Sequence, residues 1–305
     1  MNFVSPLLSI VIPAYDVAPY VREAVDSALA QTHPHVEVVV VDDGSTDSTG
    51  SILESYGDRI VLIQQQNRGL AGARNTGIAH ATGSYLGWLD ADDIWYPQRA
   101  QLAIDYLESH PGVAAVTTDA YILDGSTITD RQYYRDFLKR GFPAPQDQLS
   151  TMIDHNFMFV GTIVRASVMR RYGGFDETLR RSEDYDLWMR LLLGGQRFGL
   201  IDEPLASYRV RPDSLSASKQ AQWEAHLDVV SKHIAAIRRA GLVAPATVSW
   251  ALARRAGVLG KSRNAASFYR DTLSGTDARR VRQRAKIALL YLQQLCGGVI
   301  GERNL

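Results

Sequence analysis

Strand-like and helix-like segments alternate over the first 120 residues, and this alternation limits the fold more than any other feature. Residues 7–12 (LLSIVI) and 36–42 (VEVVVVD) are continuous apolar, β-branched runs, as expected for strands covered on both faces. Residues 19–31, between them, place small and apolar side chains at helical spacing. The pattern predicts an α/β fold in which a mainly parallel sheet is flanked by helices.

The same reading extends along the chain. Further strands are predicted at 60–64, 85–89 and 113–119. Further helices are predicted at 45–56, 70–81, 97–109, 183–193, 219–240, 246–256, 262–273 and 277–296. Residues 120–160 are rich in Gly and Pro and are predicted to be irregular. Because strand patterns stop near residue 218, we predict a first domain over 1–217 and a helical C-terminal region over 218–305.

The formal net charge of zero hides an uneven distribution. Residues 1–218 carry 18 basic and 28 acidic side chains, whereas residues 219–305 carry 15 basic and 5 acidic ones. An acidic body without a nucleic-acid module argues against nucleic acid as a partner. The basic, amphipathic segment 276–295 is typical of a helix on an anionic membrane surface, but packing on the body or at a homodimer interface explains it equally well.

Targeting signals and cysteines give further limits. The N-terminus lacks the basic region of a signal peptide, and no stretch reaches the roughly 20 apolar residues that span a bilayer. The single cysteine, Cys296, rules out an internal disulfide and a cysteine-based metal cage. We therefore expect a cytoplasmic protein, which the basic C-terminal region could hold at the inner face of the membrane.

Acidic side chains follow two of the predicted strands directly. The segment YLGWLDADD places Asp90, Asp92 and Asp93 after one strand, and VVVVDDGSTD places Asp42 and Asp43 at the end of another. Ligands of open α/β sheets bind at the carboxyl ends of strands. A turn and helix cap explains DDGSTD equally well. It explains LDADD less well, because a cap needs one carboxylate and not three. The D-x-D spacing is instead typical of a site for a hard divalent cation.

Two later segments add opposite charges. In QQNRGLAGARNTG (65–77), Arg68 and Arg74 lie near the start of a predicted helix, where the backbone also favours anions. A solvated helix face is the alternative explanation. In SEDYDLWMR, Glu183, Asp184 and Asp186 begin a helix with one apolar face. A carboxylate on so firm a support could act as a general base.

In this order, the motifs IPAYD, VVVVDDGSTDST, NRGLAGARNTGI, GSYLGWLDADD, GGFDE and SEDYDLWMR resemble those of family 2 inverting glycosyltransferases with the GT-A fold. The likeness covers about residues 7–215. It implies that residues 1–119 bind a nucleotide-sugar and residues 120–217 form the acceptor side. It also implies transfer of a sugar to a hydroxyl of a glycan or lipid-linked acceptor, in the synthesis of cell-surface polysaccharide or glycoconjugate. A UDP-sugar is the donor expected from family frequency.

The resemblance also implies roles for individual residues. Residues Pro13, Ala14 and Tyr15 would pack on the nucleotide base, and Asp42 and Asp43 would contact base or ribose. Arg74 and Asn67 would lie near the nucleotide. The D-x-D residues Asp90, Ala91 and Asp92 would bind ribose and, through the two carboxylates, the Mg²⁺ or Mn²⁺ that bridges the diphosphate. Glu183 would line the donor site, and Asp184 would be the catalytic base.

The chain departs from the family pattern in SYRVRPDSLS (207–216). The position that often holds a histidine near the metal is Arg211 here. An arginine cannot ligate a metal but pairs well with a diphosphate. We therefore expect Arg211 to contact phosphate, with a solvated loop arginine as the alternative.

Two other functions fit part of the pattern. A non-catalytic nucleotide-sugar or glycan-binding module could share this fold, although the intact D-x-D and Glu-Asp pair argue against it. A metal-dependent nucleotidyltransferase would use similar carboxylates but would leave the helix at 183–193 and the GGFDE segment unexplained. Release of nucleoside diphosphate or of pyrophosphate separates the two enzyme classes.

Overall fold

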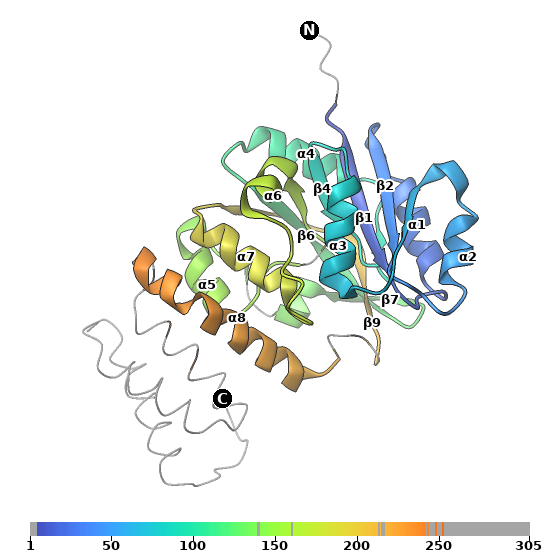
Figure 1. The fold of residues 1–305 in the computed structure, drawn as a ribbon. Coiled ribbons are helices and arrows are strands. Elements are labelled where there is room, and N and C mark those ends of the chain that lie inside the picture. The colour runs from blue at the N-terminus through green and yellow to red at the C-terminus, as the bar shows by residue number, and fades with distance from the viewer. Residues whose placement is uncertain are drawn as a thin grey trace. The chain divides into compact units, whose positions relative to one another are not determined.

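The computed structural model describes residues 5–138, 141–159, 161–212 and 217–241, with the single positions 214, 243, 248 and 252. The chain divides into two compact units, one of residues 1–145 and 157–217 and the other of residues 146–156 and 218–305 (Figure 1). The predicted helices at 262–273 and 277–296, and the basic segment 276–295, lie outside the described residues. So does the predicted helix at 246–256, except for positions 248 and 252.

The first unit is built on one mixed sheet with the strand order β3-β2-β1-β4-β8-β6-β9-β5, and β7 pairs with β6. Its strands are β1 (Leu8–Ala14), β2 (Val36–Asp42), β3 (Val61–Gln64), β4 (Tyr85–Trp88), β5 (Ile94–Trp95), β6 (Ala115–Asp124), β7 (Thr127–Gln132), β8 (Ile163–Arg165) and β9 (Phe198–Val210). Strands β1 to β4 are parallel, whereas β8 runs antiparallel to both β4 and β6. The prediction of an α/β fold with flanking helices is confirmed.

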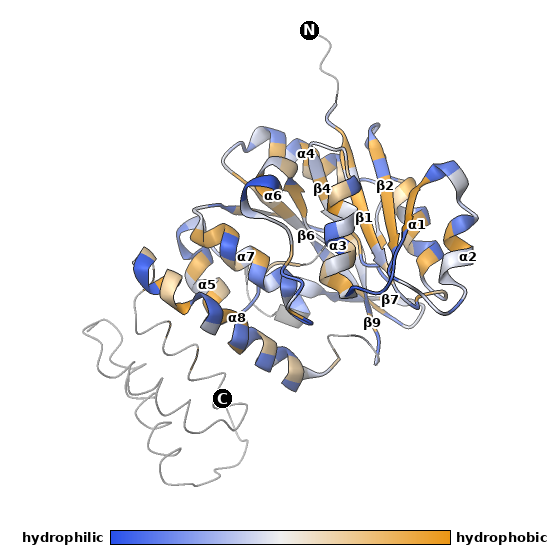
Figure 2. Ribbon diagram, in the orientation of Figure 1, coloured by the Kyte–Doolittle hydropathy of each residue, from blue (hydrophilic) through white to orange (hydrophobic). Residues whose placement is uncertain are grey.

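Helices cover both faces of this sheet. They are α1 (Val21–Leu29), α2 (Thr49–Glu54), α3 (Gly69–His80), α4 (Arg99–Ser109), α6 (Ala166–Tyr172) and α7 (Glu183–Leu193). The apolar stripe of α1 packs in one core cluster with β1, β2 and α4. On the other face, α3 approaches β1 so closely that a Cβ at Gly77 would lie 2.3 Å from a Val11 methyl group. Hydrophobic residues accordingly concentrate in the central strands (Figure 2).

The second unit contains α5 (Gln148–Asp154) and α8 (Lys219–Ala240). Helix α8 has its N-cap at Ser218, whose side chain accepts a hydrogen bond from the backbone of Ala221. None of the helices in the part of the chain that the structure describes is long and apolar enough to cross a membrane.

The structure corrects two sequence predictions. Residues 120–160 are not irregular throughout: β6 continues to Asp124, turns at Gly125 with a φ of 59° and returns as β7, and α5 follows later. The helix predicted at 45–56 begins only at Thr49. Within the predicted first turn, the backbone N–H of Thr46 donates to Asp16 Oδ1 at 2.7 Å.

Candidate active site

The order of the central strands places a crevice at their carboxyl ends. Strand β1 pairs with β2 on one side and with β4 on the other, so the chain connections diverge there. Ligands of open α/β sheets bind outside the strands at such a point. The segments that follow β1, β2 and β4 begin with Tyr15, Asp43 and Leu89, and Tyr15 is 47% exposed. The three acidic or aromatic segments predicted to bind a nucleotide therefore share one edge of the sheet.

The two aspartates at the end of β2, Asp42 within the strand and Asp43 just after it, hold the adjoining loops. Asp42 Oδ1 accepts a hydrogen bond from the backbone of Ser45 at 3.0 Å. Asp43 Oδ1 accepts from Gln65 Nε2 at 2.6 Å and from the backbone of Arg68 at 2.9 Å. Both side chains are buried. One oxygen of Asp43 thus fixes the loop before α3, and its expected contact with base or ribose stays a prediction.

Arg74 joins the two acidic motifs of the site. Its guanidinium, 1% exposed, donates to Asp90 Oδ1 at 2.7 Å and to Glu183 Oε1 at 2.5 Å. Asp90 follows β4 and Glu183 begins α7, so one side chain of α3 ties the D-x-D segment to the start of α7. These two carboxylates favour the charged form and raise the pKa of Arg74 although burial acts in the opposite direction.

Aromatic rings also pack around this arginine. The Phe175 ring centroid lies 5.3 Å from the Arg74 guanidinium carbon, within the range of a cation–π contact. Phe175 also packs edge-on against Trp88, which in turn packs against Trp188 of α7. The position of Arg74 is therefore set by packing as well as by charge.

Asp184 stands beside this ion-pair network at the N-terminus of α7. Ser182, the residue before α7, has a φ of 60°, which is uncommon for a residue with a side chain and often marks a functional site. Burial, with the charge of neighbouring Glu183, raises the pKa of Asp184 to about 6, while Arg74 acts in the opposite direction. A carboxylate with this pKa is largely ionised at neutral pH and can still accept a proton.

Two arginines at the end of β9 contact Asp92. Arg211 Nε lies 3.1 Å from Asp92 Oδ2, and Arg209 Nε donates to the Asp92 backbone carbonyl at 2.7 Å. Asp93 is buried and accepts a hydrogen bond from the Arg209 backbone at 2.8 Å. Burial and the neighbouring Asp90 raise the pKa of Asp92 to about 6, although Arg211 lowers it. Through its bond with the Arg209 backbone, the buried Asp93 carboxylate supports the loop that carries the D-x-D residues.

The donor set fits a hard divalent cation. Asp90 and Asp92 are partly exposed, with side-chain exposures of 25% and 18%, and they offer carboxylate oxygens of the kind that Mg²⁺ and Mn²⁺ prefer. Within the described residues, no group of three or more His, Cys, Asp or Glu side chains is arranged to hold a metal ion. Two carboxylates suit a cation that completes its shell with water and phosphate.

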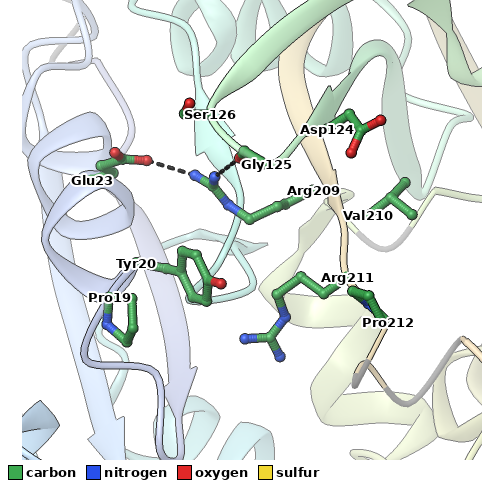
Figure 3. Close-up of a pocket in the computed structure, with 10 residues that line it drawn as sticks. All are labelled: Pro19, Tyr20, Glu23, Asp124, Gly125, Ser126, Arg209, Val210, Arg211 and Pro212. Carbon is green, nitrogen blue, oxygen red and sulfur yellow. Dashed lines mark hydrogen bonds and ion pairs between the residues drawn. The ribbon is translucent and has the colours of Figure 1, made fainter.

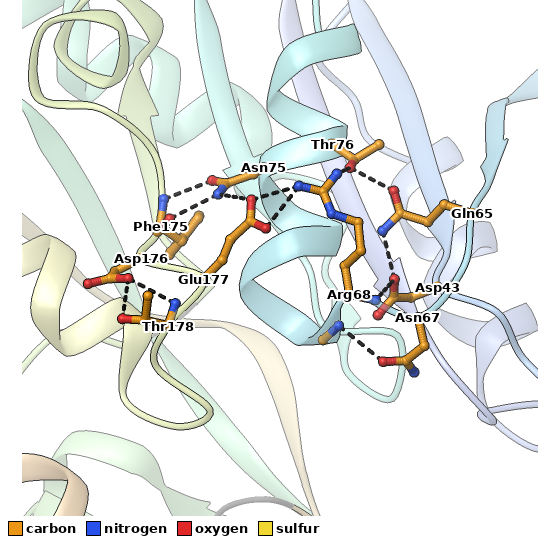
Figure 4. Close-up of polar contacts among 11 residues, drawn as sticks. Asp43, Gln65, Asn67, Arg68, Asn75, Thr76, Phe175, Asp176, Glu177 and Thr178 are labelled. Atoms are coloured by element: carbon orange, nitrogen blue, oxygen red, sulfur yellow. Dashed lines mark hydrogen bonds and ion pairs between the residues drawn. The ribbon is translucent and has the colours of Figure 1, made fainter.

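A polar clamp, formed by Arg68, Asn75 and Glu177, ties α3 to the GGFDE loop (Figure 4). Arg68 pairs with Glu177 at 2.8 Å. The Asn75 side chain bonds both the N–H and the carbonyl of Phe175, at 2.8 and 2.9 Å, and reaches Glu177 at 2.9 Å. Sequence reasoning assigned no role to Asn75 or Glu177, and it expected Arg68 to favour anionic ligands. In the structure, the anion that Arg68 contacts is the carboxylate of Glu177, 109 positions further along the chain.

Replacing Asn75 by alanine is expected to lower the free energy of unfolding by about 1–3 kcal/mol, because the Phe175 backbone groups lose their partners. Urea denaturation would measure the change. Asn67→Ala is the matched control, since the Asn67 side chain is exposed and accepts from the Gly69 backbone at 3.1 Å. Equal effects of the two substitutions would contradict a special role for the clamp.

The predicted residues fall into two groups. Arg74 forms ion pairs with Asp90 and Glu183, and Arg211 forms a separate ion pair with Asp92. The other predicted residues belong to the segments that resemble the family motifs, and they are Pro13, Ala14, Tyr15, Asp42, Asp43, Asn67, Ala91 and Asp184. The roles of this second group in donor binding and catalysis stay predictions.

Comparison with sequence families gives a direct match. The family described as Glycosyl transferase family 2 matches residues 9–167, just over half of the chain. An uncharacterized glycosyltransferase of Rickettsia typhi is 36% identical over 195 residues, which are 63% of this chain and 60% of that protein. Chondroitin synthase of Escherichia coli is 33% identical over 235 residues, 75% of this chain and 33% of that protein. The chain thus spans less than two thirds of these relatives.

Solved structures with this fold are more distant in sequence. TarS of S. aureus, residues 1–349 in complex with UDP, has a TM-score of 0.63 at 18% identity, covering 95% of this chain and 88% of that one. A mannosyltransferase of Pyrobaculum calidifontis, in complex with GDP-Man and Mn²⁺, has a TM-score of 0.60 at 22% identity, covering 96% and 88%. The ordered motifs, the fold and the family match agree, and the chain belongs to glycosyl transferase family 2 with the GT-A fold.

Proposed function

We propose that the chain transfers a sugar, with inversion, from a nucleoside-diphosphate sugar to a hydroxyl of a glycan or lipid-linked acceptor. The observation that carries this proposal is Arg74, which bonds Asp90 and Glu183 together and so joins the donor-side and base-side motifs. Relatives of named activity support this proposal, because chondroitin synthase builds a polysaccharide and the TarS and mannosyltransferase structures hold nucleotides or nucleotide-sugars.

In the proposed reaction, Asp184 accepts the proton of the acceptor hydroxyl. The acceptor oxygen forms a bond to the anomeric carbon as the bond from that carbon to the diphosphate breaks, and the nucleoside diphosphate leaves. Mg²⁺ or Mn²⁺ held by Asp90 and Asp92 would offset the charge that develops on the leaving group. Arg74 keeps Asp90 and Glu183 in place, and the φ of Ser182 directs the chain into α7.

A donor panel tests this function. UDP- and GDP-sugars are incubated with Mn²⁺ or Mg²⁺ and with glycan and polyprenyl-linked acceptors, and release of nucleoside diphosphate is measured alongside calorimetric binding. Release of nucleoside diphosphate is expected, with a UDP-sugar as the first candidate. Release of pyrophosphate would contradict the proposal in favour of nucleotidyl transfer. Donor binding without any turnover across the panel would favour a non-catalytic binding module.

The activity should depend on pH through Asp184. Because the base must be ionised and its pKa is raised to about 6, kcat/KM should be constant above that pH and fall about tenfold per unit below it. A pH–rate profile with the preferred donor measures this. A profile that stays flat down to pH 4 would contradict Asp184 as the base.

The cytoplasmic location, the membrane contact and the homodimer stay predictions.

A further inference from the structure

Two arginines at the end of β9 lie against the ring of Tyr20 (Figure 3). The guanidinium carbons of Arg209 and Arg211 lie 4.8 and 5.0 Å from the ring centroid. Arg209 is buried, and its guanidinium donates to Glu23 and to the carbonyls of Asp92 and Gly125. These bonds fix Arg209 as a structural residue.

Arg211 is placed differently. It follows the last residue of β9, lines a cleft of about 390 Å³ beside Tyr20, and its side chain is 17% exposed. Its Nε lies 3.1 Å from Asp92 Oδ2, a carboxylate that the proposed function assigns to the cation. Tyr20 lines the same cleft, and the Arg211 guanidinium lies against its ring.

Each of the two D-x-D carboxylates already has an arginine partner. Asp90 is paired with Arg74, which is 1% exposed and held by a second carboxylate, so this pair cannot separate easily. Asp92 is paired with Arg211. A divalent cation at these carboxylates would lie within a few ångströms of the Arg211 guanidinium, and two positive groups at that distance repel each other strongly in a partly buried site.

We propose that Arg211 is the resident counter-ion of Asp92 and that a divalent cation must displace it to bind. The inference rests on the proposed function, because it concerns the same metal-binding carboxylates. It explains how an arginine can occupy this position: the guanidinium neutralises Asp92 before the cation arrives. Once displaced, it is available to the phosphate oxygens, with which arginine forms strong paired hydrogen bonds.

Binding of Mn²⁺ to the free protein tests the competition without any turnover. The electron paramagnetic resonance signal of free Mn²⁺ is recorded during titration of wild type, Arg211→Gln and Arg211→Lys. Arg211→Gln should bind Mn²⁺ about threefold to tenfold more tightly than wild type, because the competing ion pair is gone. Arg211→Lys keeps the charge and should bind like wild type. Arg59→Gln removes the same charge from η1 (Gly57–Arg59) and should change nothing.

The Asp92→Asn variant separates failure of this inference from failure of the proposed site. If Asp92→Asn weakens Mn²⁺ binding but Arg211→Gln binds like wild type, the competition is refuted and the carboxylate site stands. If Asp92→Asn leaves Mn²⁺ binding unchanged, the metal site and the inference are both wrong. The competition is also refuted if wild type, Arg211→Gln and Arg211→Met all bind Mn²⁺ equally weakly. Arg211→Met replaces Arg211→Gln should the latter fail to fold.

Discussion

Asp184→Asn is expected to lower kcat by about 10²–10⁴-fold while donor binding stays close to wild type, because only the proton acceptor is lost. The asparagine has nearly the same shape and retains the position at the start of α7. Turnover is measured as release of nucleoside diphosphate, and donor affinity by calorimetry on the same preparations.

Asp58→Asn is the matched control for this substitution. It makes the same chemical change at an exposed position of η1, outside the segments that form the site. Its turnover should equal that of wild type. Transfer at the wild-type rate by Asp184→Asn would show that another group takes the proton. Parallel loss of donor binding and turnover would show that Asp184 acts in binding.

Arg74→Met is expected to lower the free energy of unfolding by about 3–5 kcal/mol and to abolish transfer. The substitution leaves Glu183, 6% exposed, and the partly buried Asp90 without their shared cation. An unpaired buried carboxylate is costly, so the start of α7 and the D-x-D segment should lose their fixed spacing. Urea denaturation followed by circular dichroism measures the stability.

A double-mutant cycle separates charge from packing at this position. Glu183→Gln removes one of the carboxylates that Arg74 neutralises, so Arg74→Met should cost less in a Glu183→Gln background than in wild type. The difference should exceed about 1 kcal/mol. Strict additivity of the two substitutions would contradict the ion pair as the link between α3 and α7. Packing on Phe175 would then be the main contribution of Arg74.

Local sequence patterns predicted the first half of the fold well. The β-branched runs of β1 and β2 are buried on both faces, and the small residues of α3 allow the close approach to Val11. These are short-range signals. The hairpin of β6 and β7 was missed although Asp124-Gly125 is a strong hairpin signal, because the glycines and prolines around it suggested an irregular segment.

The site could be predicted by residue type but not by pairing. The D-x-D and Glu-Asp motifs identified the acidic groups, whereas the bonds of Arg74 to both motifs join residues 16 and 109 positions apart. The contacts of Arg211 and of Arg68 likewise depend on how β9 and the GGFDE loop return to the sheet. Such long-range pairs follow from the topology, which a pattern of neighbouring residues does not contain.

The anomeric configuration of the product tests the central claim most directly. The donor found active in the panel is used with its acceptor, and the first-formed linkage is assigned by proton nuclear magnetic resonance. Direct attack by the acceptor hydroxyl, with Asp184 as the base, predicts that an α-linked donor gives a β-linked product. A product that retains the donor's configuration would contradict the single-displacement mechanism and the role of Asp184 in it.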